Sequence, residues 1–342
     1  MRAAIFREHG GVDKLELAEL PDPQPGAGAV VLRVRAAALN HLDLWVRRGL
    51  PGIEIPLPHV GGSDIAGEVV ALGAGVTDLE PGARVVVNPG LWCGKCEWCL
   101  KGEHSLCVVY RIIGEHTDGG FAELVSVPAA NCVPIPAGFT DEEAAAVPLV
   151  FLTAWRALIT QASLRAGETI LILGASGGVA SAAIQIAKFA GGRVLAVTSS
   201  DEKAAQARAL GADEVIDRTQ GDFSKQAFKL TERRGVDVVL ENTGAQTWEG
   251  SVRALARGGR LVTYGGTTGP MGQTDIRLLF WKQVRLIGST MGTADEFRRV
   301  TQLVWERRLR PVVDRVLPLA EIRAAHEALE AGEQFGKIVL KP

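Results

Sequence analysis

The sequence lacks the features that would indicate a membrane or nucleic-acid function. No apolar run reaches the roughly 20 residues that span a bilayer. The opening MRAAIFREHGG carries charges at Arg2, Arg7 and Glu8, where a secretory signal would be apolar. The formal net charge is only -2, and the sequence offers no basic face for nucleic acid. We therefore expect a soluble cytoplasmic protein that binds neither nucleic acid nor membrane.

Cysteine is scarce, and its distribution is uneven. The 342 residues contain five cysteines, of which four fall within one stretch with the spacing C-x2-C-x2-C-x7-C. These four are Cys93, Cys96, Cys99 and Cys107. The spacing is typical of a closed tetrahedral zinc site, which leaves no position for substrate or water. We therefore expect one structural zinc ion that orders residues 90–110, which we call the cysteine lobe.

Two disulfides are the alternative for these cysteines. The absence of a secretory signal and the three-residue spacing both disfavour that alternative. The fifth cysteine, Cys132, lies in the apolar stretch 131–135, where a buried unreactive thiol is expected.

The length and the 47% hydrophobic content predict two domains. Residues 1–150, which include the cysteine lobe, show short alternating runs broken by Gly and Pro, and these favour a strand-rich, partly barrel-like domain. Residues 151–290 alternate apolar strands with helical patterns, which predicts an α/β fold with a parallel sheet. Its six strands are expected at 169–173, 193–197, 214–216, 236–241, 260–264 and 284–288. Residues 291–342 are expected to return to the first domain.

A glycine-rich loop follows the first of these strands. The strand runs into Gly174-Ala175-Ser176-Gly177-Gly178-Val179-Ala180, and a helical pattern comes next. Gly177 and Gly178 let the backbone approach a pyrophosphate, whose charge is met by the N–H groups and positive dipole end of the helix. Strand, loop, helix and second strand in this order predict a dinucleotide site. Its loop residues are Ser176, Gly177, Gly178 and Val179.

The end of the second strand decides which dinucleotide fits. An acidic residue there would bind the ribose hydroxyls of NAD, but this strand ends in Thr198, Ser199 and Ser200. Small hydroxyl residues leave room for a 2′-phosphate, and Lys203 and Arg218 can supply positive charge. We therefore favour NADP(H) over NAD. The alternative is that Ser199 and Glu202 form a capping box for the next helix, which is compatible with either cofactor.

These residues resemble the medium-chain dehydrogenase/reductase superfamily, which contains zinc alcohol dehydrogenases and quinone oxidoreductases, over essentially the whole chain. The resemblance rests on the cysteine lobe, the segment GGSDIAGEV at 61–69, residues 118–125, the glycine loop, and GKIVL at 336–340. It implies a GroES-like catalytic domain at 1–150 and a doubly wound Rossmann domain at 151–290. It also implies that Lys337 faces the cofactor pyrophosphate. The residues that it places at the nicotinamide are Thr153, Gly265, Gly266, Ser289 and Met291.

The chain departs from the alcohol dehydrogenase branch where that branch holds a catalytic zinc. Asn40 stands in place of the first cysteine ligand, Ser63-Asp64 replaces the His-Glu pair, and the third ligand position falls near Leu149. Asn and Ser are poor zinc ligands, and Leu is none. The segment Leu39-Asn40-His41-Leu42-Asp43 instead resembles the Leu-Asn-x-x-Asp segment of the quinone oxidoreductase branch, whose members work without a catalytic metal.

The reaction expected from such a site is reduction of a conjugated acceptor. Alcohol oxidation needs a Lewis acid or strong base, whereas reduction of a quinone or α,β-unsaturated carbonyl needs a few oriented donors. We expect NADPH-dependent reduction of such a small molecule, with Asn40 as candidate carbonyl donor and Ser63 or water as proton source. Thr153 completes the candidate catalytic set. The alternative for Asn40 and Ser63 is that they only satisfy backbone groups.

Two rival functions stay open from the sequence. One is alcohol or aldehyde oxidoreduction, with a recruited metal or with a base such as His41. The other is a non-catalytic cofactor-binding protein that retains the fold. Relatives pair through the edge strand of the cofactor sheet, which would be 284–288 here, so the resemblance implies a homodimer or homotetramer.

Overall fold

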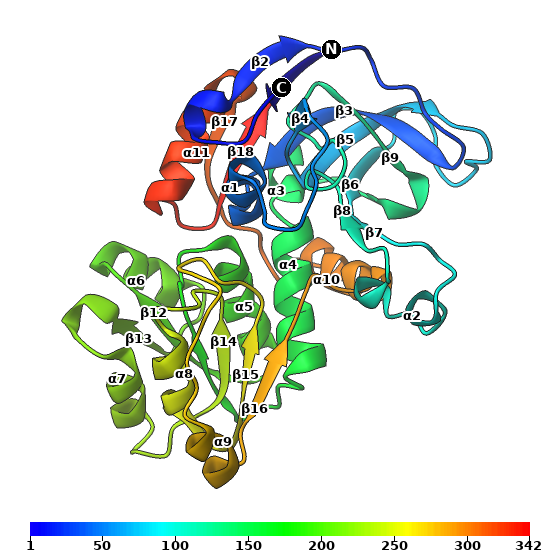
Figure 1. Ribbon diagram of the computed structural model, residues 1–342. Helices are drawn as coiled ribbons and strands as arrows, with labels where there is room; N and C mark the ends of the chain where they lie inside the picture. Colours follow the sequence, from blue (N-terminus) through cyan, green and yellow to red (C-terminus); the bar gives the residue numbers. More distant parts are fainter. The chain divides into compact units, whose positions relative to one another are not determined.

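The computed structural model describes all 342 residues, which divide into two compact units. The first unit comprises Met1–Leu152, Gly292–Arg307 and Pro311–Pro342, and the second comprises Thr153–Met291 and Arg308–Arg310. Figure 1 shows a strand-rich unit that contains both termini, and a unit of helices around a parallel sheet. None of the helices combines the length and the apolar composition needed to cross a membrane.

A seven-stranded sheet is the main element of the first unit. Its strand order is β10-β6-β5-β3-β18-β17, and β9 also pairs with β3. The strands are β3 (Ala29–Ala38), β5 (Asp64–Leu72), β6 (Arg84–Val87), β9 (Leu124–Pro128), β10 (Cys132–Pro134), β17 (Val313–Pro318) and β18 (Lys337–Lys341). All pairs are antiparallel except β17 with β18. The C-terminal segment therefore completes a sheet begun by the N-terminal third of the chain.

Two smaller sheets and several short helices surround this sheet. One sheet joins β1 (Arg2–Phe6), β2 (Glu16–Glu19) and β4 (His59–Val60), and the other joins β7 (Gly90–Leu91) and β8 (Arg111–Ile112). The helices are α1 (His41–Arg48), α2 (Glu97–Leu100), α3 (Asp141–Ala145), α10 (Ala294–Trp305) and α11 (Ile322–Ala331). Helix α4 (Pro148–Trp155) contains the boundary between the units.

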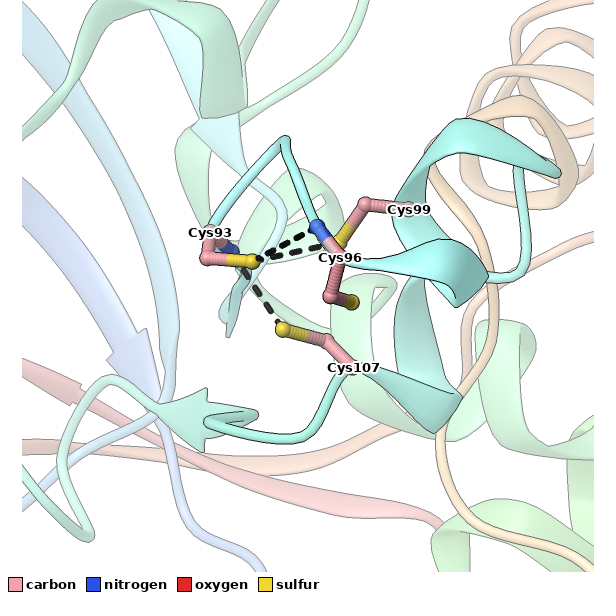
Figure 2. A group of neighbouring side chains, drawn as sticks. All are labelled: Cys93, Cys96, Cys99 and Cys107. Carbon is pink, nitrogen blue, oxygen red and sulfur yellow. Dashed lines mark hydrogen bonds between the residues drawn. The ribbon is translucent and has the colours of Figure 1, made fainter.

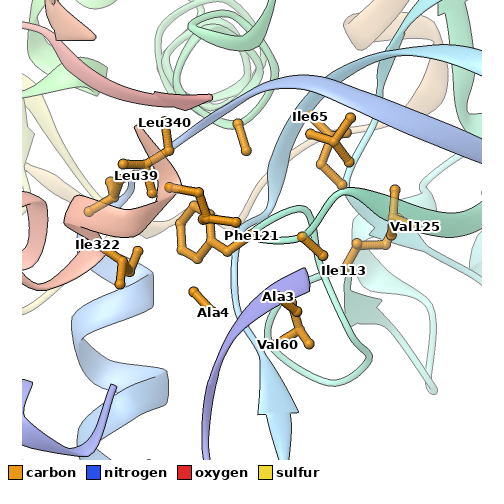
Figure 3. Packing of buried hydrophobic residues seen from close by; sticks show 14 of the residues in the cluster. Ala3, Ala4, Leu39, Val60, Ile65, Ile113, Phe121, Val125, Ile322 and Leu340 are labelled. Carbon is orange, nitrogen blue, oxygen red and sulfur yellow. The ribbon is translucent and has the colours of Figure 1, made fainter. Parts of the chain in front are cut away.

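The core of the first unit draws on both ends of the chain. In β3 the buried Leu32 and Val34 alternate with the exposed Arg33 and Arg35, as expected for a strand with one apolar face. Figure 3 shows Phe121 at the centre of the cluster, with side chains from the N-terminal strand and the C-terminal segment around it. Burial of these side chains stabilises the unit by about 25 cal/mol for each Å² of apolar surface removed from water.

The second unit is a six-stranded parallel sheet with the order β13-β12-β11-β14-β15-β16. Its strands are β11 (Thr169–Ile172), β12 (Arg193–Thr198), β13 (Glu214–Asp217), β14 (Val236–Glu241), β15 (Leu255–Thr263) and β16 (Arg285–Gly288). The helices are α5 (Gly178–Phe189), α6 (Asp201–Ala209), α7 (Phe223–Leu230), α8 (Trp248–Ala254) and α9 (Ile276–Lys282), and a π-helical turn spans Arg156–Gln161. This order is the doubly wound Rossmann arrangement, which reverses direction between β11 and β14. The predicted fold class is confirmed.

The predicted and observed strands of this sheet differ by more than one residue at a single boundary. The strand expected at 260–264 begins at Leu255, because Leu255 pairs with Val236 before a bulge restores the register at Arg260. Gly258 lies within this bulge with φ of 72°, a conformation that favours glycine.

Candidate functional site

The four clustered cysteines converge on one point of the cysteine lobe. Their sulfur atoms all lie within 4.8 Å of one another, and Figure 2 shows the four side chains gathered together. Cys93 and Cys96 precede α2, Cys99 lies within it and Cys107 follows it. Cys93 Sγ lies 3.9 Å from Cys99 Sγ and accepts the N–H of Cys96 at 3.3 Å. Gly94 and Gly102 have positive φ, which permits the turns between the ligands.

This geometry fits a zinc ion better than a disulfide. A tetrahedral zinc with bonds of about 2.3 Å places its sulfurs about 3.8 Å apart, close to the observed distance, whereas a disulfide needs about 2.05 Å. The N–H groups of Cys99 and Val108 lower the pKa of the Cys96 thiol to about 6, which favours the thiolate that binds metal. Four sulfurs complete the coordination of zinc, so the metal would order the lobe and take no part in catalysis. Burial raises the pKa of the Cys99 thiol to about 12, as it does that of Cys132 outside the cluster.

A second polar cluster lies where three strands of the large sheet meet. Ala38, at the end of β3, is opposite Asp64 of β5 on one side and Val339 of β18 on the other. Because β18 begins at Lys337 and Asn40 lies two residues after β3, this register brings Lys337, Asp64 and Asn40 together. Two side chains from the N-terminal half thus meet a lysine from the C-terminal strand.

Hydrogen bonds join the three side chains. Lys337 Nζ donates to Asn40 Oδ1 at 2.5 Å and to Asp64 Oδ2 at 2.7 Å, and Asn40 Nδ2 donates to Asp64 Oδ2 at 3.0 Å. The Lys337 side chain is 3% exposed and that of Asp64 is 0% exposed. Figure 1 shows β5 and β18, which carry Asp64 and Lys337, in one sheet with β3, the strand that leads to Asn40. The Asn40 side chain therefore bonds to two charged side chains, but it also forms a capping box with Asp43 at the start of α1, so its role at the substrate stays a prediction.

These residues do not fit a catalytic zinc ion. Lys337 occupies Asn40 Oδ1 and one oxygen of Asp64, and the other Asp64 oxygen accepts the N–H of Leu149 at 2.8 Å. The Lys337 ammonium, which is bonded to the oxygens of both Asn40 and Asp64, would repel a divalent cation at the same place. Ser63 Oγ is buried without a hydrogen-bond partner, and a serine hydroxyl is a poor zinc ligand.

Two buried carboxyl groups lie close to this cluster. Asp43 accepts the N–H of Asn40 at 2.6 Å and of Gly62 at 3.1 Å, which joins the start of α1 to the residues before Ser63. Burial raises the pKa of Asp43 to about 7. Burial, with a smaller contribution from Asp43, also raises the pKa of Glu115 to about 7. The sequence reasoning missed Glu115, whose only local signal is an acidic residue after Gly114 in a loop.

The predicted phosphate loop joins β11 to α5. Gly174 has φ of 61°, and its carbonyl accepts the N–H of Gly177 at 2.9 Å. Gly177 is the N-cap of α5 and is followed by Gly178 and Val179, whose N–H groups belong to the unpaired first turn of the helix. A backbone turn at the N-terminus of a helix at the sheet's point of reversal is the arrangement that binds a pyrophosphate. Ser176 lies in the same turn.

The predicted 2′-phosphate residues lie at the ends of β12 and β13. Thr198 pairs with Asp217, so Ser199 and Arg218 follow at the same edge of the sheet. The predicted alternative of a capping box from Ser199 is wrong, because Ser200 is the N-cap of α6 and its hydroxyl accepts the N–H of Lys203 at 3.3 Å. Ser200 adopts the extended conformation of a cap, whereas Ser199 precedes it.

A fully buried carboxylate orders the turn after β14. Glu241 is 0% exposed and accepts the N–H groups of Thr243 at 2.7 Å and Gly244 at 3.1 Å. The hydroxyls of Thr247 and Ser251 also donate to it. Carbonyl groups of this turn accept the N–H groups of Thr267 and Thr268. These two residues follow Gly265 and Gly266, which are predicted to lie at the nicotinamide. Sequence reasoning had assigned no role to Glu241.

The remaining predicted nicotinamide residues gather in the second unit. Thr153 Oγ1 donates to Met291 Sδ at 3.8 Å, and Met291 has φ of 47°. Ser289 bonds through its N–H to Thr263 at the end of β15, and its hydroxyl is buried without a partner. Their role in cofactor binding stays a prediction.

Comparisons with known proteins assign the chain to a family. Residues 26–137 match the alcohol dehydrogenase GroES-like domain, and residues 178–306 match the zinc-binding dehydrogenase family. An acryloyl-coenzyme A reductase of Metallosphaera sedula is 35% identical over 99% of both chains.

Solved structures agree with this assignment. A structure described as an NAD-dependent alcohol dehydrogenase is 46% identical, with a TM-score of 0.96 over 100% of both chains. A crotonyl-CoA carboxylase/reductase in complex with NADP is 30% identical, with a TM-score of 0.92 over 100% of this chain and 94% of the other. The chain therefore belongs to the zinc-type medium-chain dehydrogenase/reductase superfamily and is an oxidoreductase.

Proposed function

We propose that this protein is an NADPH-dependent reductase that transfers hydride to a quinone or an α,β-unsaturated carbonyl without a catalytic metal. The observation that carries the proposal is the buried Lys337 ammonium, which is bonded to Asn40 and Asp64. These two residues stand at positions where the alcohol dehydrogenase branch holds its catalytic zinc. Because the Lys337 ammonium already occupies this place, a zinc ion cannot bind there to polarise an alcohol.

The remaining polar groups suit a conjugated acceptor. Asn40 uses one amide N–H on Asp64, so its second N–H is available to a substrate carbonyl oxygen. Conjugation spreads the incoming charge onto that oxygen, where a fixed donor stabilises it. Ser63, whose buried hydroxyl has no partner, or a water molecule would then supply the proton.

NADPH would supply the hydride, and the second unit carries the residues proposed to bind it. Gly177, Gly178 and Val179 would face the pyrophosphate, while Ser199 and Arg218 would face the 2′-phosphate. The relative solved with NADP supports this choice of cofactor. Zinc in the cysteine lobe would take no direct part in this chemistry because its four ligands fill its coordination.

The relatives suggest which acceptors to test. An acryloyl-coenzyme A reductase and a crotonyl-CoA carboxylase/reductase are both named for enoyl thioesters, which are α,β-unsaturated carbonyl compounds. Oxidation of NADPH should be followed with acryloyl-CoA, crotonyl-CoA, a simple enone and a quinone, and reduction of NAD(P) with a panel of alcohols. Turnover of at least one conjugated acceptor, with little alcohol oxidation, is expected. Alcohol oxidation without reduction of any conjugated acceptor would overturn the proposal.

Alcohol dehydrogenation is the second candidate. The observation in its favour is the 46% identity to a structure described as an NAD-dependent alcohol dehydrogenase. Metal analysis of the purified protein separates the two: one zinc per chain supports a structural metal only, and two zinc ions per chain support the alcohol dehydrogenase.

We also propose that the protein assembles as a homodimer or homotetramer through the edge of the second unit's sheet. β16 pairs with β15 on one side only, so its other edge is open. Large apolar side chains are exposed on and near this strand. They are Met271, Ile276, Phe280, Trp281 and Leu286. A surface of this kind is typical of a protein interface.

A further inference from the structure

The Asn40 carboxamide is held between two charges of opposite sign. Its oxygen accepts from the Lys337 ammonium, and its nitrogen donates to the Asp64 carboxylate. We propose that Lys337 and Asp64 are positioning residues, which fix this carboxamide in one orientation and so fix the N–H that it offers to the substrate oxygen. This inference rests on the proposed function.

The charges determine the orientation of the amide. If the carboxamide turned by half a revolution, its NH2 group would face the ammonium and its oxygen would face the carboxylate. Both contacts would be repulsive, and the buried side chains exclude the water that could relieve them. Asn40 therefore keeps one N–H on Asp64 and one fixed N–H for another acceptor.

The ammonium also strengthens that donor. A cation bonded to an amide oxygen withdraws electrons from the amide nitrogen and makes its N–H a better donor, and low local polarity enhances the effect. Negative charge on the substrate oxygen is greatest in the transition state, so the benefit falls mainly on kcat. Loss of Lys337 should thus slow turnover more than it weakens substrate binding.

Asp64 holds the cation in place. Its oxygens receive three donors, from Lys337, from Asn40 and from the N–H of Leu149, so the carboxylate is well satisfied. A buried ion pair adds little net stability compared with an apolar pair of similar size. Stability alone does not require the buried charges of Lys337 and Asp64, whereas orientation of the Asn40 carboxamide does.

The family resemblance implies another role for Lys337, at the cofactor pyrophosphate, and the two roles predict different outcomes. A phosphate-binding lysine would raise the Kd of NADPH when replaced. A lysine that acts through Asn40 would lower kcat and leave the Kd of NADPH nearly unchanged. K337M tests both, and K341M is the matched control, because Lys341 lies on the same strand with its side chain 53% exposed and paired with Glu142.

The first experiment compares the wild type, K337M and K341M with the best conjugated acceptor, by steady-state kinetics and by fluorescence titration with NADPH. We expect K337M to lower kcat by roughly 10- to 100-fold, with less than about a threefold change in the Kd of NADPH. K341M should resemble the wild type. A large rise in Kd with an unchanged kcat would overturn the inference.

The second experiment asks whether Lys337 acts through Asn40. In the N40A background, K337M should cause little further loss of kcat, because the group that it positions is gone. Losses that multiply would show that Lys337 acts independently and would overturn the inference. K337M leaves the buried Asp64 carboxylate without its cation. D64N/K337M carries neither buried charge, so it should fold even if K337M does not, and it should show the same loss of kcat. Wild-type protein that reduces no conjugated acceptor would instead refute the proposed function.

Discussion

Glu115 is a carboxyl group that folding places in an unfavourable environment. Its side chain is 7% exposed, and the nearby ring of His116 accepts the N–H of Ile112 through Nδ1, so that nitrogen offers no proton to the carboxylate. Burial and the neighbouring Asp43 therefore raise the pKa of Glu115 to about 7. In the unfolded chain the pKa would return to its ordinary value of 4.5.

This pKa difference predicts how pH affects stability. Between about pH 4.5 and 7 the folded protein binds more protons at Glu115 than the unfolded chain, so this residue lowers stability as pH rises through that range. E115Q carries no such charge. Relative to the wild type, E115Q should gain roughly 2–3 kcal/mol in free energy of unfolding between about pH 5 and pH 8. Urea unfolding at the two pH values measures the gain.

The exposed Glu80 supplies the control for this comparison. The free energy of unfolding of E80Q should differ from that of the wild type by the same amount at both pH values. The cysteine site also responds to pH, but the wild type and E115Q share it, so its contribution cancels; Asp43 interacts with Glu115, so the measured difference includes the repulsion between these two carboxylates. A constant difference between E115Q and the wild type would contradict the assigned environment of Glu115.

At the scale of single residues, the sequence could predict which zinc ligands the candidate catalytic site lacks but not which side chains bond to one another there. The identities of Asn40, Ser63 and Leu149 are enough to argue against a zinc ligand set. The partnership of Lys337 with Asp64 could not be foreseen, because 273 residues separate them and only the pairing of β18 with β3 brings them together. Glu115 was missed for a related reason, since its burial depends on tertiary packing.

Among the elements, the cysteine lobe has the least secondary structure to support it. It contains the two-residue strand β7, the short helix α2 and a turn at His104–Leu106, so the metal should supply much of its order. C99S removes one of four ligands. We expect the zinc content to fall from about one per chain towards zero and the thermal midpoint to fall by about 5 °C or more. Metal analysis and calorimetry measure the two effects.

C132S is the matched control for C99S, because Cys132 lies outside the cluster and is partly buried. Its zinc content should equal that of the wild type. Retention of a full complement of zinc by C99S would contradict the tetrahedral site.

The turn after β14 is an element whose shape depends on one carboxylate. Glu241 accepts two N–H groups of the turn and two hydroxyls from α8 and its N-cap. E241Q replaces one acceptor oxygen by a donor, which leaves buried donors unsatisfied and should displace the turn. If the turn helps to hold the cofactor, the Kd of NADPH should rise by roughly tenfold. Fluorescence titration gives this constant directly.

Glu249 provides a comparison on the same helix, because its side chain is 70% exposed and pairs with Arg253. E249Q should bind NADPH as the wild type does. An unchanged Kd in E241Q would show that the turn does not affect the cofactor.

The strands and helices of the second unit could be predicted because local sequence patterns define them. Apolar runs between helical segments predicted all six strands, of which the inner ones are largely buried, whereas the edge strand β16 is largely exposed. The cap of α6 was misplaced by one residue, from Ser200 to Ser199, because adjacent serines offer the same hydroxyl and only the backbone conformation selects between them.

At the scale of the whole molecule, the resemblance and the composition together predicted a strand-rich unit and a Rossmann unit. The right-handed connections of parallel sheets limit the strand orders open to the second unit, and the family resemblance selects the Rossmann order among them. The sheet of the first unit is different, because β18 of the C-terminal segment lies between β3 and β17. Such long-range pairing has no local signal, and only the family resemblance and the late strand patterns indicated it.

Assembly is the property of the whole molecule that the surface predicts most directly. Phe280 is 64% exposed and Trp281 is 67% exposed, both on α9, the helix before the open edge of β16. Burial of two such rings against a second copy would stabilise a dimer by several kcal/mol, at about 25 cal/mol per Å². Two negative charges at these positions would oppose that burial, since charged side chains are costly to desolvate. F280E/W281E should therefore shift the protein to a monomer.

Analytical ultracentrifugation over a range of concentrations measures this shift. L100E is the control, because Leu100 is a similarly exposed apolar residue, 76% exposed, in the cysteine lobe of the first unit. It should sediment as the wild type does if the interface is the sheet edge. A wild type that is monomeric at all concentrations would contradict the interface, and so would an F280E/W281E variant that stays associated. If L100E alone dissociates the assembly, the interface must instead involve the cysteine lobe, whose exposed Val108 and Val109 would then belong to it.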